Sequence, residues 1–584
     1  MNDLKRLFGY MGPYRRDMAL GMLLVVVESA FEMVIPILMS DIIDQGVAHG
    51  DVREIGWTGV EMAVCAVLAL ITGLLYARYA ARASYGFGAR IRQAEYAKVQ
   101  AYAFGNLDHF ETSSLITRMT TDVTVVQNAI NGGFRPMVRG PAMLVLGVAL
   151  SFYMSPSLAA VFFVCAPVLG VILFFIVRRI APLYARLQQA MDHLNTVVQE
   201  CLTAIRAVKA FVRGEYEEEK FQAVNTELMD VSMTTFRTAV LNLPAFQLTM
   251  YAAMVSILWF GGNMILQGSL TVGRLTSFLS YVLQVMNSLM MISNVFLLMT
   301  RSLASAHRIA AVLDEQVELE SPAHPVTEIP DGGVKFEHVS FKYHPDAAEY
   351  ALAGIDLVIQ PGETVGILGG TGSAKSTLVQ LIPRLYDATE GRVLVGGRDV
   401  REYDLTALRD AVGIVLQKNV LFSGTVRENL LWGNPGASDE ELWAACRAAC
   451  ADEFLQRMPG GLDADLGQGG VNVSGGQKQR LCIARTLLKK PRVLIFDDSV
   501  SAVDTATEAR IRKALAALTG VTKIIIAQRV TSVMNTDKIV VLEDGRIHTV
   551  GTHSQLLASD PIYQEIYHSQ MKGGGADGST ADHR

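Results

Sequence analysis

The sequence has few cysteines, and none of them is arranged for a metal site or a disulfide framework. The six cysteines among 584 residues are Cys65, Cys165, Cys201, Cys446, Cys450 and Cys482. No two of them form the C-x-x-C pair that is common in zinc and redox motifs, and Cys446 and Cys450 have the spacing of neighbours on one helix face. We therefore expect reduced thiols buried in helices.

Charge is also scarce. Charged residues make up 18% of the chain and hydrophobic residues 50%, which is more apolar than an ordinary soluble enzyme. The net charge of −6 gives no indication of nucleic acid, and we expect no such partner. The first 17 residues carry basic side chains such as Lys5 and Arg16 but no small-residue cleavage site, so they predict a cytosolic lead-in to a retained helix.

Long apolar segments account for this composition. They lie at about residues 18–43, 57–79, 135–154, 158–177, 246–266 and 276–299. A helix needs about 20 apolar residues to cross a bilayer. The third segment has a short apolar core, 141–154, and is extended back to about residue 135. These segments predict a transmembrane domain, residues 1–313, with six membrane-spanning helices.

The joins between the segments are unequal. Those after the second and fourth segments run to roughly sixty residues and carry most of the Lys and Arg of this half. The positive-inside rule places both joins and both termini in the cytoplasm, with the chain in the cell inner membrane. Because the joins contain little proline, we expect the helices to continue into the cytosol. We predict short transverse helices near 106–114 and 214–221.

Two carboxylates interrupt the first apolar segment. Glu28 and Glu32 have i,i+4 spacing and share a helix face. A carboxylate at membrane depth is costly and usually faces a cavity or a polar partner. Two interpretations stay open: a substrate path through the membrane, or a polar contact between helices.

The second half is an ordinary α/β sequence. Residues 314–332 contain three prolines and several acidic residues, and they predict a linker. Residues 333–571 predict one nucleotide-binding domain. Residues 572–584 are rich in Gly, Ser and Asp and predict a disordered tail.

A glycine-rich stretch follows the apolar run 364–368 and precedes a second apolar run, 378–382. Its residues are Gly369, Gly370, Thr371, Gly372, Ser373, Ala374, Lys375, Ser376 and Thr377. Strand, glycine loop, Lys and Ser/Thr followed by a helix is the phosphate cradle of nucleoside triphosphatases. Lys375 would reach the terminal phosphates of ATP, and Ser376 would hold Mg²⁺. The usual pattern has Gly where this chain has Ala374, whose Cβ restricts the backbone.

Further motifs follow in a characteristic order. They are Tyr343 after an alternating strand, Gln417 after an apolar strand, Ser474-Gly475-Gly476-Gln477, Asp497-Asp498 at the end of the strand 493–496, Asp504, and Gln528 after the run 524–527. This constellation resembles the ATP-binding cassette (ABC) transporters. With six preceding spans, residues 5–571 resemble an ABC exporter half-transporter.

The resemblance implies a role for each motif. The ring of Tyr343 stacks on adenine, while Gln417 and Asp497 join Ser376 around Mg²⁺. Asp504 belongs to the loop that follows the acidic strand end. The signature at Ser474–Gln477 begins a helix, whose N–H groups form an anion site. In the family, two such domains dimerise head to tail, so that each ATP lies between one chain's cradle and the other's signature.

Three residues depart from the family pattern. Asp498 stands where the family has a glutamate that polarises the attacking water. Gln528 stands where it has a histidine, and Gln468 replaces a glutamate before the signature. Since the signature itself is intact, the chain resembles the non-catalytic subunit of heterodimeric exporters. Its own site would bind ATP, and its signature would complete the partner's hydrolytic site.

The transported compound is not specified by these motifs. An exporter of small hydrophobic or amphipathic compounds, drug-like or lipid, fits the resemblance best. A siderophore-type importer on the same scaffold, a lipid flippase and an ATP-gated regulatory or channel-like relative stay open. The expected partners are a second half-transporter with an intact site and the lipid bilayer.

Overall fold

The structure is a computed structural model, and it describes residues 2–498 and 505–573. The predicted tail lies almost entirely outside this range. The chain forms two compact units, Met1–Gln100 with Thr112–Glu315, and Ala101–Glu111 with Gln316–Arg584. Residues 101–111 therefore pack with the second unit, although their neighbours in sequence belong to the first.

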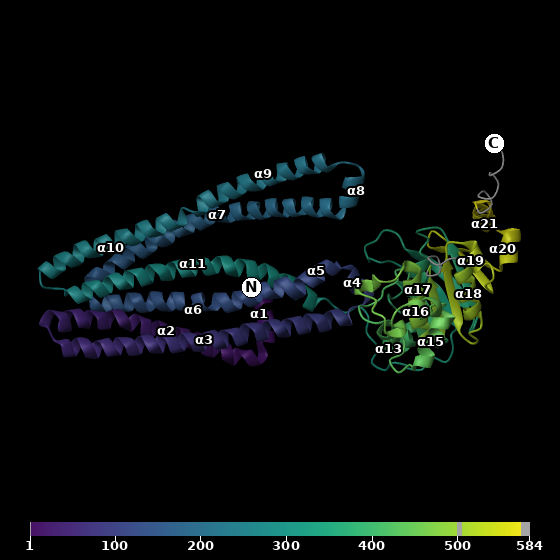
Figure 1. Ribbon diagram of the computed structural model, residues 1–584, viewed down its shortest axis with the longest axis horizontal. Helices are drawn as coiled ribbons and strands as arrows, with labels where there is room; N and C mark the ends of the chain where they lie inside the picture. The colour runs from purple at the N-terminus through teal and green to yellow at the C-terminus, as the bar shows by residue number, and fades with distance from the viewer. Residues whose placement is uncertain (1, 499–504, 574–584) are drawn as a thin grey trace. The chain divides into compact units, whose positions relative to one another are not determined.

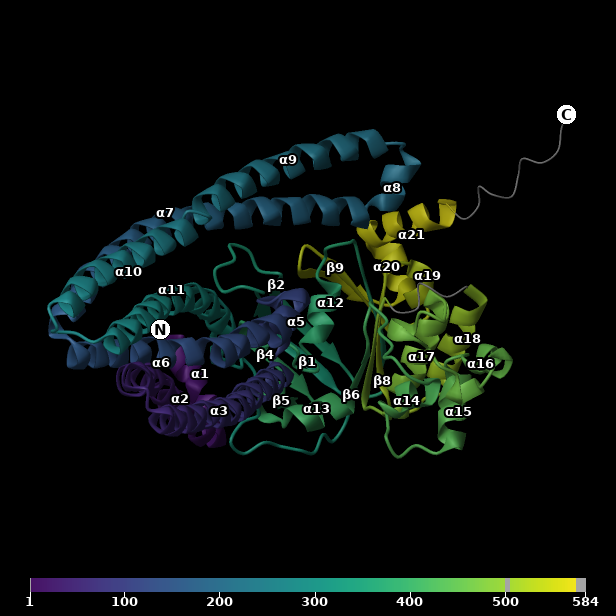
Figure 2. The same cartoon turned by 60° about the vertical axis from the view of Figure 1, so that its left-hand side comes forward.

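The second unit contains two sheets (Figure 2). An antiparallel sheet has the order β2-β1-β4-β5, and a larger sheet has the order β10-β9-β3-β8-β7-β6. The antiparallel strands are β1 (Val334–Phe341), β2 (Leu352–Ile359), β4 (Glu390–Val395) and β5 (Arg398–Asp399). The larger sheet contains β3 (Thr364–Gly369), β6 (Val412–Val415), β7 (Val493–Asp497), β8 (Thr522–Ala527), β9 (Lys538–Glu543) and β10 (Arg546–Gly551).

In the larger sheet β6, β7, β8, β3 and β9 are parallel, and β10 is antiparallel to β9. Strands β7 and β8 are buried along their whole length, as expected of parallel strands with both faces covered. The helices of this unit are α4 (Phe104–Asp108), α12 (Lys375–Gln380), α13 (Leu405–Ala411), α14 (Val426–Leu431), α15 (Asp439–Ala448), α16 (Asp452–Arg457), α17 (Gly475–Leu488), α18 (Thr505–Ala516), α19 (Val530–Val533), α20 (His553–Ser559) and α21 (Pro561–Gly573).

The first unit is helical. Its elements are α1 (Asn2–Leu7), η1 (Phe8–Tyr14), α2 (Arg15–Asp41), η2 (Ile42–Val47), α3 (Val52–Ala101), α5 (Thr112–Thr117), η3 (Arg118–Asp122), α6 (Val123–Met154), α7 (Pro156–Thr203), α8 (Ile205–Ala210), α9 (Gly214–Ala239), α10 (Asn242–Leu266) and α11 (Val272–Asp314). Among the described residues, six helical stretches are long and apolar enough to cross a membrane. The predicted fold class, six membrane helices followed by an α/β domain, is confirmed.

Several helices extend well beyond a membrane's thickness. The 50 residues of α3 correspond to about 75 Å at 1.5 Å per residue, against a hydrocarbon core of about 30 Å. Both views show α7 running alongside α9 and α10, with α8 closing the far end of this hairpin (Figures 1 and 2).

One predicted transverse helix is misplaced. The sequence analysis put it at 214–221, near the tip of the second long join. Gly214 instead begins the 26-residue helix α9, whose first turn contains Glu215 and Glu217. Acidic side chains stabilise a helix N-terminus, which explains the start at this position. The short transverse helix is α8, which is bounded by non-helical backbone at Ala204 and at Val212, where φ is +53°. The other, α4, lies close to the predicted range.

An ion network joins α2 to α6. Glu28, only 4% exposed, accepts hydrogen bonds from both Arg135 and Arg139. Arg139 also donates to Glu32 at 2.5 Å. The partner that a buried carboxylate requires is therefore a pair of arginines on the third span. The structure therefore contains the polar contact between helices that was one of the two interpretations. The other interpretation, that Glu28 and Glu32 lie on a substrate path, stays a prediction.

Removing Arg139 should destabilise this unit. The Arg139→Met variant leaves Glu32 without its arginine and Glu28 with one arginine fewer, and breaking a buried pair from one side costs about 3 kcal/mol. We expect a lower thermal unfolding midpoint in detergent. The control is Arg82→Met, since Arg82 is mostly exposed and lies 4.0 Å from Asp17. The double variant Glu32→Gln/Arg139→Gln should recover part of the loss, and equal midpoints for Arg82→Met and Arg139→Met would contradict the role of this network.

Candidate nucleotide-binding site

The glycine-rich stretch forms the loop between β3 and α12. Gly372 has φ +87°, and Ala374, the residue before the helix, has φ +65° and ψ +26°. Ala374 therefore adopts the left-handed conformation that Gly adopts without strain. The Cβ that the sequence singled out costs about 1–2 kcal/mol of backbone strain in this conformation.

Lys375 is folded into this loop. Its Nζ donates to the carbonyls of Gly370 at 2.6 Å and Gly369 at 3.0 Å, and to Ser373 Oγ at 3.2 Å. Burial lowers the pKa of the Lys375 ammonium, and the carboxylates of Asp498 and Asp497 oppose that effect. A cation in this position gives the loop the charge that a triphosphate requires.

Two residues that are suited to bind Mg²⁺, Ser376 and Asp497, contact each other. Ser376 Oγ donates to Asp497 Oδ1 at 2.7 Å, across the strand β8 that separates β3 from β7. Burial raises the pKa of Asp497, and the hydrogen bond from Ser376 lowers it. Hydroxyl and carboxylate oxygens are the donors that Mg²⁺ takes in proteins, so these residues fit the ion. Gln417, exposed just beyond β6, offers a further oxygen. Bound there, Mg²⁺ would neutralise charge on the phosphates.

The two unusual residues of the site contact each other. Gln528, immediately after β8, donates from Nε2 to Asp498 Oδ2 at 2.8 Å. Asp498 follows β7 and has φ +46°. The carbonyl of Gln528 in turn accepts a hydrogen bond from Gln570 of α21. The carboxylate expected to act on water is thus held by an amide that carries no positive charge.

Tyr343 lies at the nucleotide end of the antiparallel sheet, two residues after β1. It is 44% exposed, and its hydroxyl is 2.8 Å from Oγ1 of Thr377 in the cradle. Its ring is edge-on to those of Phe341 and Tyr386, with centroids 4.9 and 5.4 Å away. The structure therefore brings the predicted adenine platform and the cradle together.

The signature begins a different helix, α17. Ser474 Oγ accepts from the N–H of Gln477, and Gln477 Oε1 accepts from the N–H of Ser474 at 2.8 Å. This capping box fixes the helix start and keeps Gly475 and Gly476 at its first turn. Ser474 and Gly475 are exposed. The predicted residue Asp504 lies outside the described residues.

Sequence reasoning missed the residues that attach 101–111 to this unit. Asn106 is fully buried, and its Nδ2 donates to the carbonyl of Gln316 at 2.7 Å. The hydroxyl of Tyr386 donates to Asp108 at 2.7 Å. No periodicity or motif identifies such pairs, because the partners lie more than 200 residues apart in the chain.

The first unit contains an apolar cavity of about 940 Å³ between α1, α2, α6 and α11. Among its lining residues are Phe8, Met18, Met22, Phe134 and Met137. Among the lining residues that the structure describes, Lys5 is the one charged side chain. A cavity of this size and lining is suited to a hydrophobic or amphipathic compound.

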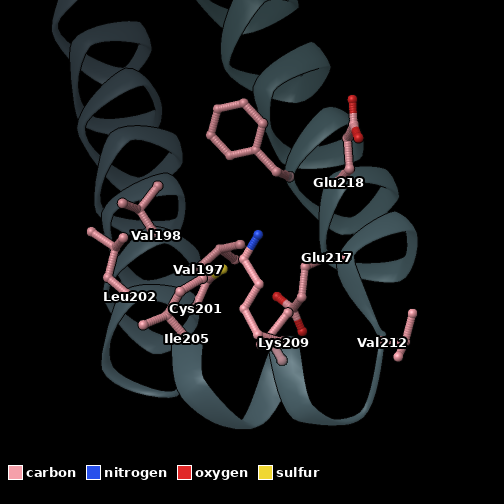
Figure 3. Close-up of a pocket in the computed structure, with 12 residues that line it drawn as sticks. Val197, Val198, Cys201, Leu202, Ile205, Lys209, Val212, Glu217 and Glu218 are labelled. Atoms are coloured by element: carbon pink, nitrogen blue, oxygen red, sulfur yellow. The ribbon is translucent and has the colours of Figure 1, made fainter.

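A second apolar pocket, of about 470 Å³, lies at the tip formed by α7, α8 and α9 (Figure 3). Figure 3 shows Val198 and Leu202 on α7, with Ile205 and Lys209 of α8 below them. Leu202 is 64% exposed, and the nearby Phe211 is 77% exposed. Exposed apolar groups gathered at the end of a long hairpin indicate a contact surface.

Comparisons with known proteins agree with these features. Residues 18–289 match the family described as the ABC transporter transmembrane region, and residues 352–501 match the family described as ABC transporter. The chain is 37% identical to the uncharacterized ABC transporter ATP-binding protein YfiB of Bacillus subtilis, over 99% of this chain and all of that protein. It is 34% identical to the ATP-dependent lipid A-core flippase of Chromobacterium violaceum, over 98% of each chain.

A solved structure shares the fold. The structure of a bacterial Atm1-family ABC exporter with ATP bound superposes with a TM-score of 0.80 at 24% sequence identity. The match covers 97% of this chain and 100% of that one.

Substitutions at Ala374 should move stability in opposite directions. Ala374→Gly removes the left-handed strain but adds freedom to the unfolded chain, so we expect a gain below about 1 kcal/mol. Ala374→Val places a β-branched residue in that conformation and should cost about 2 kcal/mol. Thermal unfolding and binding of a fluorescent ATP analogue measure both. The same direction of change in the two variants would contradict the conformation described for this loop.

Proposed function

Because this chain belongs to the ABC transporter family, we propose that it is one half of a heterodimeric, ATP-driven exporter whose own ATP site binds and retains nucleotide. Hydrolysis takes place at the other site of the dimer, which this chain completes with its signature. The chain is a multi-pass membrane protein, and both termini are assigned to the cytoplasm by the charge of its long joins.

The observation that carries this proposal is the contact between Asp498 and Gln528. A side chain one methylene shorter than glutamate withdraws its carboxylate by roughly 1.5 Å. A general base must lie within about 2.6–3.2 Å of the proton that it takes, and it contributes about 10²–10⁴-fold to the rate. Asp498 is shorter and engaged at 2.8 Å by the amide of Gln528. These features favour ATP retention over turnover.

The signature supports the complementary half of the proposal. Ser474 and Gln477 cap α17 reciprocally, and the exposed first turn presents backbone N–H groups to an anion. The capped and exposed start of α17 has the geometry of an anion site. A chain with an intact signature and an altered base is suited to serve a partner's ATP.

A partner subunit also accounts for the α7–α8–α9 tip. Three of its apolar side chains, Leu202, Phe211 and Val212, are 64%, 77% and 87% exposed. An apolar surface at the cytosolic end of a hairpin needs a protein cover, since the bilayer cannot reach it. The second half-transporter, whose cradle would face this chain's signature, is the simplest source of that cover.

The substrate that fits the cavity is a hydrophobic or amphipathic compound. The carboxylates of the first span are engaged by Arg135 and Arg139, so they do not favour a cationic substrate. A second candidate function is lipid flipping, which the name of the Chromobacterium relative and the apolar lining of the cavity both favour. Lipid translocation in reconstituted vesicles separates it from export of soluble drug-like compounds.

The two ATP sites should respond differently to substitution. In the heterodimer, Ser474→Ala or Gly475→Asp should abolish most ATP hydrolysis, because each damages the turn that completes the partner's site. Asp498→Ala should change turnover less than threefold, since we assign little hydrolysis to this base. Steady-state ATPase rates of the reconstituted heterodimer measure both effects.

The chain purified alone is the control. It should bind ATP and hydrolyse it slowly or not at all. Substantial turnover by the pure chain that is lost in Asp498→Ala would overturn the proposal. Equal losses from Ser474→Ala and Asp498→Ala in the heterodimer would indicate two working sites.

A further inference from the structure

The second unit contains a polar pocket at the amino ends of two strands of its larger sheet. The pocket has a volume of about 510 Å³, which is within the range of small-molecule sites. Thr364, the first residue of β3, and Lys523 of β8 both line it, and they pair with each other in the parallel register. The ATP cradle follows the other end of β3. Because the six residues of that strand span roughly 17 Å, the pocket is separate from the cradle.

One face of α18 lines this pocket. Ala509, Arg512, Lys513 and Ala516 have the i, i+3, i+4, i+7 spacing of residues that share a helix face. The two alanines are short and leave room beside them, while the residues between them supply positive charge. Residues 531–536, which include α19, also line the pocket and contribute hydroxyl and amide groups.

The lining of the pocket is cationic. Among the lining residues that the structure describes, Arg512, Lys513 and Lys523 are charged, and all three are positive. Glu508, one turn before Arg512, accepts a hydrogen bond from Ser532 at 2.7 Å and lies 3.5 Å from the Arg512 guanidinium. Lys513 is exposed, and its side chain has no ion pair in the described part of the chain. The positive charge of the pocket is therefore only partly balanced.

Lys523 is the least usual of the three cations, because it is only 6% exposed. Its Nζ donates to the carbonyl of Leu518 at 2.7 Å, and within residues 2–498 and 505–573 no carboxylate is bonded to it. Burial lowers the pKa of the Lys523 ammonium, and the charge of Asp537 opposes that effect. The Asp537 carboxylate itself accepts from the N–H of Thr364 at 2.8 Å. A buried ammonium is stabilised by a bonded anion, and the pocket is a space from which one can reach it.

We propose that this pocket binds a small organic phosphate, whose phosphate group is held by Arg512, Lys513 and Lys523. A phosphate monoester presents three terminal oxygens, and Arg and Lys are the side chains that recognise phosphate in proteins. Leu515 and Met534 also line the pocket and give the organic part an apolar contact. The inference does not depend on the proposed function, because it concerns the opposite end of β3 from the ATP cradle.

Calorimetric titration of the full-length chain in nanodiscs with phenyl phosphate tests the proposal. A non-hydrolysable ATP analogue with Mg²⁺ fills the ATP cradle, so that the added phosphate does not bind there. We expect saturable binding with a Kd of about 1 mM or lower. Inorganic phosphate should bind more weakly because it lacks the ring, and benzoate because a carboxylate has one oxygen fewer. Hydrogen–deuterium exchange should slow in α18 and in residues 531–536 when phenyl phosphate binds.

Three variants and a matched control locate the site. Arg512→Met should weaken phenyl phosphate binding about tenfold, the usual effect of losing a hydrogen bond between charged groups. Lys513→Met should weaken it about threefold, since an exposed charge is screened, and this exposed position is suited to substitution without loss of folding. Ala516→Phe keeps all three cations but fills the pocket, so it should abolish binding. Arg510→Met is the control: Arg510 is also on α18, but it bonds to Glu453 at 2.6 Å and does not line the pocket, so its variant should keep the affinity within twofold.

Four results would overturn the proposal. Absence of saturable binding up to about 10 mM phenyl phosphate would leave Lys523 with only its bond to the carbonyl of Leu518. Equal affinities in Arg510→Met and Arg512→Met would place the binding outside this pocket. Benzoate binding as tightly as phenyl phosphate would contradict the choice of phosphate, and inorganic phosphate binding as tightly would contradict the organic part.

Discussion

The nucleotide site depends on the register of three parallel strands. Leu368 of β3 pairs with Ala527 of β8, and Asp497 of β7 pairs with Ile526. This register brings the carboxyl ends of the strands to one edge of the sheet, where ligands of α/β folds bind. The hydrogen bond from Ser376 to Asp497 then closes the edge across β8. A one-residue shift of β7 would turn Asp497 to the other face and separate it from Ser376.

The same edge explains why the altered residues act as a pair. Asp498 and Gln528 follow the adjacent strands β7 and β8, which brings these two side chains together. A histidine there could place positive charge beside the phosphates, whereas the amide of Gln528 satisfies the carboxylate without adding charge. The pair is therefore a polar contact between a carboxylate and a neutral amide. Such a contact is compatible with a site that holds a triphosphate without attacking it.

Much of this architecture could be predicted from the sequence, because its signals are local. The spacing from the β3 run to Lys375 predicted the loop between a strand and a helix, and Ala374 was singled out because its Cβ restricts the backbone. The apolar segments predicted six spans, since length and composition suffice for that purpose. Family membership also followed from motif order alone.

What could not be predicted depends on contacts between distant residues. Glu28 gave no indication that its partners are Arg135 and Arg139, more than 100 residues away. The short helix predicted at 214–221 is instead the start of the long helix α9, whose first turn contains Glu215 and Glu217. The placement of 101–111 with the second unit depends on Asn106 and Tyr386, which no pattern connects.

Under the proposed function, the ATP site of this chain acts by binding. Hydrolysis is one way to use ATP, but binding alone changes the stability of whichever conformation contacts the nucleotide more. A site in which Gln528 holds Asp498 would then keep its nucleotide longer, and its contribution to the transporter would depend on whether ATP is present.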